Sequence, residues 1–314
     1  MSKTWNRWIT AATIVVVIAA LVIMAHLLQQ FTWQRIIASL NRIGSRQLGL
    51  AALYTAGSYL TLTGFDLMGT RYAGSKIAYP RVALTSFLSL SIGHTVGLAP
   101  FSSGAIRYRY YSKWGLDARQ VGMVILFSAL TVAIGEMALS AFSLLAFPDL
   151  AQKILRLDLA ITMAIGGVIV TALSAYVVLC ARLTRPLKLF KWSINLPGWR
   201  LALAQIVVGM VNFLLVASAL HALLAADAPI GFIVVATAYI LGNLAALLTH
   251  VPGGVGVLEA TIVLLLPGTD VIGPLIAFRI IYFLVPLAIG LVTLATTELL
   301  SRLPARKSQN PQQA

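Results

Sequence analysis

The chain has 314 residues, of which 59% belong to the apolar set A, V, I, L, M, F, W, Y and C, while only 10% are charged. A typical soluble domain is about 45–50% apolar and about 25% charged, so this composition excludes an ordinary soluble enzyme, a disordered chain and a fibrous repeat. At roughly 20 apolar residues per crossing, the chain has room for about six to eight membrane crossings and none for a soluble catalytic domain. The formal net charge of +14 is spread between the apolar spans. That spread favours membrane topology and anionic lipid as its cause, and argues against nucleic acid as a partner.

Membrane helices are predicted by the apolar spans at residues 9–28, 48–68, 82–101, 119–147, 158–180, 201–225, 230–250 and 272–300. The first is too long for a signal peptide and is not followed by a small-residue cleavage site, so we expect it to be retained. Residues 33–46 and 185–199 mix basic with apolar and aromatic side chains. Both are expected to form helices lying in the membrane interface, and a solvated loop is the alternative for the second. Residues 304–314 are polar and are expected to form a disordered cytoplasmic tail.

Two of the apolar spans contain breaks rich in Gly, Pro and His. The first is SIGHTVGLAPFSSGAIRYRYY at 91–111, and the second is LLTHVPGGVGVLEA at 247–260. Irregular backbone at membrane depth has to be buried in protein or line a wet cavity. Discontinuous helices of this kind mark binding sites in transporters, which makes the two breaks candidate sites.

The distribution of Lys and Arg indicates whether these broken spans cross the membrane or re-enter it. If all eight spans cross, the inner segments carry 10 and the outer segments 12 of these residues, which is no bias. If 82–116 and 230–267 are re-entrant hairpins, the totals become 17 inside and 5 outside. The positive-inside rule therefore favours the second arrangement, although eight crossings stays open as the alternative.

The expected fold is therefore an all-α polytopic membrane protein with about six full crossings and two re-entrant broken hairpins, or with eight crossings. We expect one transmembrane domain over 1–303. Within it, residues 48–147 and 201–300 both follow the order crossing, hairpin, crossing in opposite orientations. They are candidate inverted repeats, a layout found in many secondary transporters.

Ionisable groups at membrane depth are costly and usually face a cavity or a partner. Two of them, Arg107 and Arg109, follow the first break. If Ser102 or Ser103 caps the helix that starts there, its free backbone N–H groups and the two guanidinium groups suit a phosphate, with Tyr108 between them. The alternative is that both arginines anchor the inner membrane interface.

The second break contains Gly253, Gly254 and Gly256 ahead of Glu259, which is expected in the first turns of an apolar helix. Glycines allow close backbone approach, and a helix N-terminus favours a carboxylate. A cation, proton or head-group site and a simply capped helix start are the two interpretations. Near the start of the last span, Arg279 and Tyr282 are further candidates for head-group binding, and Arg279 lies where it can pair with Glu259.

The remaining candidates for a proton or polar relay are Glu136, Asp66, His94 and His250. Two histidines with dispersed acids make a poor metal site, so no metal is expected. No cofactor is expected either. The sequence shows no nucleophile–base pair and no HExxH motif, so we do not expect an enzyme.

At these residues the sequence resembles the lysylphosphatidylglycerol synthase transmembrane-region family, the flippase-like half of the multiple peptide resistance factor. Among its members it is most similar to the stand-alone bacterial inner-membrane proteins of the YbhN type. Three motifs carry the resemblance, GAIRYRYYSKWGLD at 104–117, HVPGGVGVLEA at 250–260 and AFRIIYFLVPL at 277–287. The resemblance implies movement of a lipid or amphiphile with a charged head group between leaflets. Arg107 and Arg109, Glu259, and Arg279 with Tyr282 match the basic, Gly-rich and last motifs respectively.

Together these observations predict a flippase or transporter in the bacterial cytoplasmic (inner) membrane, with both termini cytoplasmic and a head group that bears phosphate. The expected partner is membrane phospholipid, with anionic lipid favoured. A homo-oligomer and a partner lipid-modifying enzyme are further partners to consider. A secondary transporter of a small anionic or amino-acid solute, and a non-transporting lipid-binding scaffold, are the alternative functions.

Overall fold

The structure of the protein is a computed structural model. It describes residues 37, 43–96, 99–183, 187–189, 192–194, 196–225, 230–249, 257–265 and 271–302. The predicted span 9–28, residues 33–36 and 38–42 of the predicted interfacial helix 33–46, and the tail at 304–314 lie outside this part. So do the candidates His250, Gly253, Gly254 and Gly256. The same holds for the side chains of His94 and Glu259.

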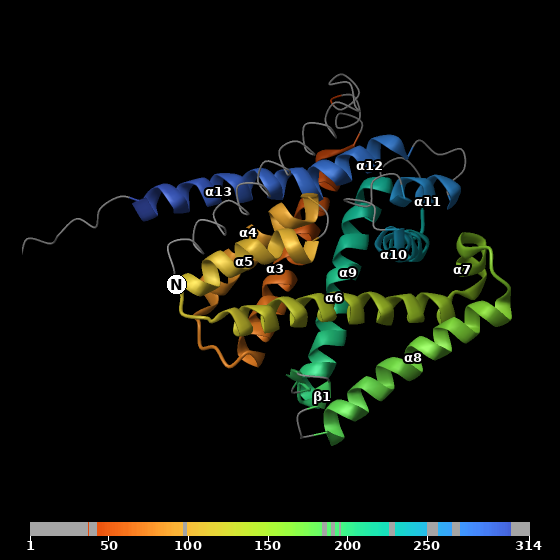
Figure 1. The fold of residues 1–314 in the computed structure, drawn as a ribbon. Coiled ribbons are helices and arrows are strands. Elements are labelled where there is room, and N and C mark those ends of the chain that lie inside the picture. Colours follow the sequence, from red (N-terminus) through yellow and green to blue (C-terminus); the bar gives the residue numbers. More distant parts are fainter. Residues whose placement is uncertain are drawn as a thin grey trace, which may run out of the picture.

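The described part is helical apart from one short β-hairpin, which confirms the all-α polytopic prediction (Figure 1). The elements are α3 (Ser45–Tyr72), α4 (Tyr79–Val96), α5 (Ala99–Lys113), α6 (Ala118–Ala146), α7 (Pro148–Leu155), α8 (Leu159–Arg182), β1 (Leu187–Leu189), β2 (Trp192–Ile194), α9 (Trp199–Leu224), α10 (Phe232–Thr249), α11 (Val257–Leu265), α12 (Ile272–Arg279), the π-helix η2 (Ile280–Leu284) and α13 (Val285–Arg302). Within the described residues, four helical segments are long and apolar enough to cross a membrane: α6, α8, α9 and the continuous helix over Gly273–Leu299.

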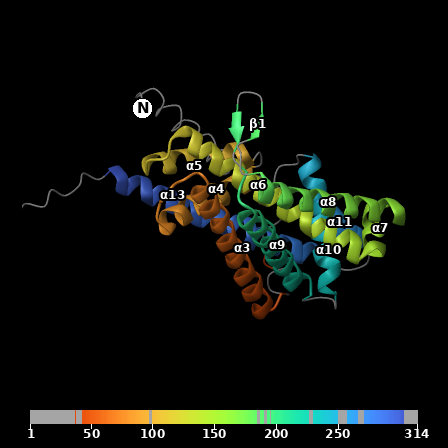
Figure 2. The ribbon, with the colours of Figure 1, turned by 90° about the horizontal axis from the view of Figure 1, so that it is seen from below.

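The centre of the bundle is formed by α3 and α9, which pack along one another (Figure 2). The Ser58 hydroxyl of α3 donates to Asn212 Oδ1 of α9 at 2.8 Å, and Thr61 donates to the same oxygen at 2.8 Å. Gly57 of α3 faces Leu215 of α9, so residue numbers fall on one helix as they rise on the other. The two central helices are therefore antiparallel.

At one point α6 crosses α9 with its backbone almost in contact. A Cβ atom built on Gly209 of α9 would lie 2.6 Å from the Cα atom of Gly135 of α6 and 3.0 Å from the Thr131 carbonyl oxygen. Small residues at such a crossing allow helices to approach closely where the surrounding lipid provides no hydrophobic driving force. This crossing fixes α6 against the central pair.

The two broken spans fold as helical hairpins. In the first, α4 packs against α5, and a Cβ atom on Gly93 would lie 2.9 Å from Ser103 Cβ. At a rise of 1.5 Å per residue, the 15 residues of α5 extend for about 22 Å. α5 is therefore shorter than a hydrocarbon core of about 30 Å, so its geometry favours a hairpin over an additional crossing. In the second hairpin, α11 packs against α10.

Each hairpin packs against a long helix of the other half of the chain. α4 contacts α13, and correspondingly α10 contacts α6. Residues with the same offset from the start of corresponding helices lie at these contacts and at the contact between α3 and α9. Ser58 and Asn212 each lie thirteen residues after the start of their helix. Glu136 and Gly290 each lie eighteen residues after the start of α6 and of α12.

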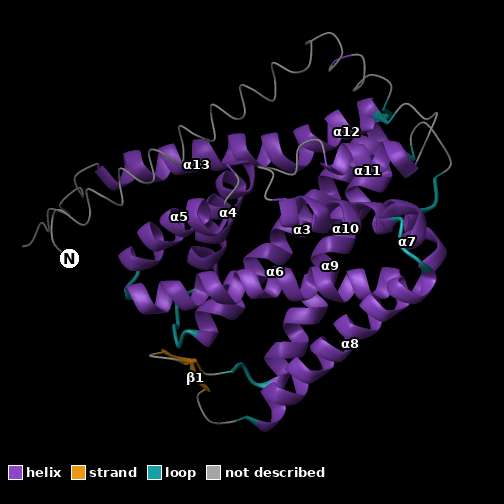
Figure 3. Cartoon of the chain, turned by 45° about the vertical axis from the view of Figure 1, so that its right-hand side comes forward, coloured by secondary structure: helices purple, strands orange, loops and turns teal. Residues whose placement is uncertain are grey.

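The prediction of an interfacial helix over 185–199 is wrong. Residues 187–189 and 192–194 pair as an antiparallel β-hairpin, with Leu187 opposite Ile194 and Leu189 opposite Trp192 (Figure 3). The sequence has a proline at 197, and a helix that reaches this residue loses a backbone hydrogen bond and clashes with its ring. Strand pairing satisfies the backbone of this short segment where a helix does not form.

Candidate functional site

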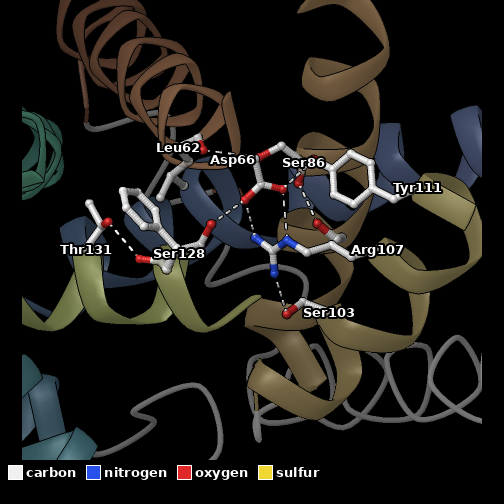
Figure 4. A network of polar contacts seen from close by, with 10 residues as sticks. Leu62, Asp66, Ser86, Ser103, Arg107, Tyr111, Ser128 and Thr131 are labelled. Carbon is white, nitrogen blue, oxygen red and sulfur yellow. Dashed lines mark hydrogen bonds and ion pairs between the residues drawn. The ribbon is translucent and has the colours of Figure 1, made fainter. Parts of the chain in front are cut away.

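A buried ion pair joins the first hairpin to α3 (Figure 4). Arg107 of α5 donates through Nε to Asp66 Oδ2 at 2.9 Å and through Nη2 to Asp66 Oδ1 at 2.8 Å. The Asp66 side chain is 0% exposed and that of Arg107 is 4% exposed. Such a two-point contact between guanidinium and carboxylate is a strong and geometrically specific form of ion pair.

Two hydroxyl groups complete the surroundings of Asp66. The Tyr111 hydroxyl donates to Oδ2 at 2.9 Å, and the Ser128 hydroxyl of α6 donates to Oδ1 at 2.8 Å. The carboxylate therefore accepts four hydrogen bonds, which is about the full capacity of its lone pairs. A charge pair at membrane depth is tolerable when it is neutral overall and its polar atoms are satisfied, and this pair meets both conditions.

The structure changes two details of the prediction for the first break. α5 begins at Ala99, so Ser103 lies inside the helix and does not cap it. Its hydroxyl oxygen instead accepts a hydrogen bond from Arg107 Nη1 at 2.8 Å. The Arg107 guanidinium is consequently engaged by α3 and by its own helix, two turns away from the helix N-terminus, where a phosphate was expected to bind.

A second ion pair lies at the end of the same hairpin. Arg109 donates through Nε to Glu298 Oε1 at 3.0 Å and through Nη2 to Oε2 at 2.5 Å, which ties α5 to α13. Lys113 Nζ lies 3.5 Å from the same carboxylate. The side chains of Arg109 and Glu298 are 16% and 21% exposed, and that of Lys113 is 45% exposed. Two cations thus share one carboxylate at a partly accessible position.

Tyr282 lies at the centre of the bundle, in the π-helix η2. Its hydroxyl is 3.0 Å from Ser58 Oγ, its carbonyl oxygen accepts from Tyr59, and its ring stacks on Phe278 at a centroid distance of 5.4 Å. The π-helix interrupts the last predicted span directly after Arg279, whose guanidinium lies over the Phe283 ring at 5.1 Å. Single π-turns occur frequently at functional sites.

Glu136 lies near the middle of α6, as predicted, and is 2% exposed. Its Oε1 accepts a hydrogen bond from Asn243 Nδ2 of α10 at 2.8 Å. Glu259 lies in the first turn of α11, also as predicted. Its expected pairing with Arg279 falls outside what the structure describes, as do the His94 side chain, His250 and the three glycines of the second break.

Among the described residues, the predicted candidates form separate groups rather than one site. Asp66 and Arg107 meet, Arg109 and Tyr108 lie toward the end of the hairpin, and Glu136 and Tyr282 occupy two further positions in the bundle. Their partners were not predicted from the sequence: Ser58, Tyr111, Ser128, Asn212, Asn243 and Glu298. Asn212 and Asn243 stand inside apolar spans, so a search for polar residues at membrane depth that included amides would have found them.

An apolar cavity of about 620 Å³ lies away from these polar groups, between α6, α8 and α9. Phe142, Val177 and Leu203 are among its lining residues, and its surface is almost entirely nonpolar. This cavity has the chemistry of lipid tails rather than of head groups.

Comparison with known proteins places the chain among membrane proteins. It is 28% identical over 312 residues to the inner membrane protein YbhN of Escherichia coli (strain K12), covering 93% of this chain and 94% of the relative. It is also 28% identical over 287 residues to the uncharacterized protein slr0712 of Synechocystis, covering 90% of this chain and 89% of that protein. No family model matches the chain. Nearly full-length similarity to an inner membrane protein, together with the apolar helices, shows that the chain is a polytopic membrane protein.

Proposed function

We propose that the protein moves a lipid with a charged, phosphate-bearing head group between the leaflets of the bacterial inner membrane, and that it carries out no catalysis. The observation that carries the proposal is α5, a helix too short to cross, which brings two arginines into the bundle beside α3 and α13. Ionised groups at membrane depth are costly and mark the paths of polar cargo. The apolar cavity beside α8 suits lipid tails.

The charges of the helix ends support an inner orientation for one end of the bundle. Gln120 Nε2 donates to the Ala73 carbonyl at 3.2 Å, and the α5 and α13 ends meet through Arg109 and Glu298, so the ends of α3, α5 and α13 lie together with the start of α6. The basic residues at the helix ends on this side are Arg71, Lys76, Arg81, Lys113, Arg119, Arg182 and Arg200. Under the positive-inside rule, this end is cytoplasmic and attracts anionic head groups.

The halves 48–147 and 201–300 are in this proposal inverted repeats. The reciprocal packing of α4 on α13 and of α10 on α6 supports this relation, as does the meeting of Ser58 with Asn212 at matched positions. Inverted repeats place the cargo site where the two halves meet and provide two equivalent conformations for alternating access.

Arg109 and Lys113 are, in this proposal, the first contact for the head group. Both cations lie within ion-pair distance of the Glu298 carboxylate. A phosphate that approaches from the cytoplasmic end competes with Glu298 for the Arg109 guanidinium, which binds phosphate in the same two-point geometry as carboxylate. Displacing Glu298 releases α13 from α5 and opens the hairpin end to the lipid.

The test is leaflet exchange of fluorescent phospholipids in proteoliposomes, with labelled phosphatidylglycerol and phosphatidylcholine followed by quenching. For Arg109→Ala we expect exchange of phosphatidylglycerol to fall about tenfold or more, the size expected from a lost hydrogen bond to a charged group. Phosphatidylcholine exchange falls less, because its head group carries no net charge. Arg46→Ala, at the opposite and exposed helix end, is the matched control.

The charge swap Arg109→Glu with Glu298→Arg separates head-group binding from simple attachment of α5 to α13. The swap rebuilds an ion pair between the two helices but moves the guanidinium off the hairpin. Continued loss of phosphatidylglycerol exchange supports binding at Arg109, whereas restored exchange shows that Arg109 only holds the helices together. If the wild type exchanges no lipid, the result favours a transporter of a water-soluble anion or a lipid-binding scaffold.

A further inference from the structure

The surroundings of Glu136 differ from those of the other buried carboxylate. Asp66 accepts four hydrogen bonds and pairs with a guanidinium, whereas Glu136 accepts a single hydrogen bond, from the neutral amide of Asn243. Within the described residues, no lysine, arginine or histidine forms an ion pair with Glu136. An ionised carboxylate with one neutral donor is strongly disfavoured in an apolar medium, whereas the uncharged acid is tolerated.

The helices packed against α6 bring no compensating charge to Glu136 in the described part. From α10, the ionisable residue near Glu136 is the buried Tyr239, and Arg279 of α12 lies near Tyr239 as well. From α9, the backbone at Gly209 packs against Gly135, the residue next to Glu136. Asp66 of α3 and Arg107 of α5 pair with each other, Arg109 of α5 pairs with Glu298, and Tyr176 of α8 donates to Gln205. Lys153 of α7 is exposed.

The same kind of helix contact forms in the other half without a carboxylate. Gly290 occupies the position in α12–α13 that Glu136 occupies in α6, and it packs against Ser91 of α4. Ser91 and Asn243 lie twelve and eleven residues after the start of their hairpin helices. Packing of a hairpin on the long helix of the other half therefore does not require an acid, so Glu136 serves another purpose at this position.

We propose that Glu136 is a proton-binding site at the contact between the two halves of the protein, and that loss of its proton releases α10 from α6. This role rests on the proposed lipid translocation, and it makes the proton the ion to which translocation is coupled. The neutral carboxyl group holds the contact through Asn243. When water reaches it, the group gives its proton to that water and becomes a carboxylate, which remains hydrated and keeps the contact open. Uptake of a proton from water on the other side closes the contact again.

The decisive experiment compares the wild type with Glu136→Gln, an uncharged variant of the same shape, in proteoliposomes with and without a pH gradient. In the wild type we expect the gradient to change phosphatidylglycerol exchange at least about fivefold, the lower end of typical coupling between two sites. In the variant we expect exchange that no longer responds to the gradient. Asp158→Asn, an exposed carboxyl-to-amide change at the start of α8, is the matched control and should respond as the wild type does.

A second measurement tests the proton site independently of lipid transport. Infrared difference spectra of the purified protein, taken on raising the pH, should show loss of a protonated carboxyl band in the wild type and in Asp158→Asn, but not in Glu136→Gln. If the wild type exchanges no lipid yet shows this band, the translocation proposal fails and the proton site stands. If the wild type and Glu136→Gln share the same band or the same response to the gradient, the proton site is overturned.

Discussion

Replacing Asp66 with Asn, or Arg107 with Gln, is expected to lower the free energy of unfolding by about 3–5 kcal/mol, because each change leaves its partner as an uncompensated buried charge. The pair joins α3 to α5, and through Ser128 it also holds α6, so the loss extends to the packing of the first hairpin. The double variant, which carries no charge at this position, is expected to be less destabilised than either single variant. Thermal unfolding in detergent, followed by size-exclusion chromatography, measures all three proteins.

The double variant also decides the role of Arg107 in transport. If it folds and fails to exchange labelled phosphatidylglycerol, Arg107 binds the head group in addition to its structural role. If it folds and exchanges lipid as the wild type does, the head-group assignment of Arg107 is wrong. Ser86→Ala serves as the control, since it removes one buried neutral hydrogen bond, to the Leu62 carbonyl, and should cost only about 1 kcal/mol.

Gly209→Leu is expected to prevent correct assembly of the central helices. Even the first added carbon atom would lie 2.6 Å from the Gly135 Cα atom, and both sides of the contact are backbone, which cannot rotate away as a side chain can. Overpacking usually costs about 1–3 kcal/mol and sometimes more, and a leucine at a backbone crossing belongs at the upper end. The measurement is the yield of monodisperse protein in detergent together with its unfolding temperature.

Gly167→Leu on α8 provides the comparison for this prediction, because a Cβ atom there meets nothing within 4 Å. We expect it to leave the yield and the unfolding temperature close to those of the wild type. Gly209→Ala should fall between the two. Equal behaviour of the Gly167 and Gly209 variants would show that α6 and α9 do not cross as described.

Hydropathy predicted the positions of the long described helices because membrane helices need long apolar runs, and this requirement acts locally along the chain. It did not predict the short helix α7, which lies between two predicted spans. The hairpins were predicted from Gly, Pro and charge, since breaks and basic residues are also local features. The pairing of Asp66 with Arg107 was not predicted, because 41 residues separate the two and no local pattern records which side chains meet. Glu298 was missed because it lies at the end of a span, where an acid is unremarkable. The run IIYFL at 280–284 carries no pattern that distinguishes a π-turn from an α-helix.

The place of α8 in the chain, between residues 48–147 and 201–300, has a consequence for how the chain is inserted. In the proposed arrangement of inverted repeats, the antiparallel helices α3 and α6 return the chain to its starting side, and α8 is the long described helix between the halves that changes the side from which the next half begins. Only 11% of the apolar window of α8 is buried, so the single crossing that α8 adds matters more for the fold than the packing of its side chains. A chain without α8 would insert its second half in the same direction as the first. α3 and α9 would then run parallel, and Ser58 and Asn212 could not meet across an axis in the membrane plane.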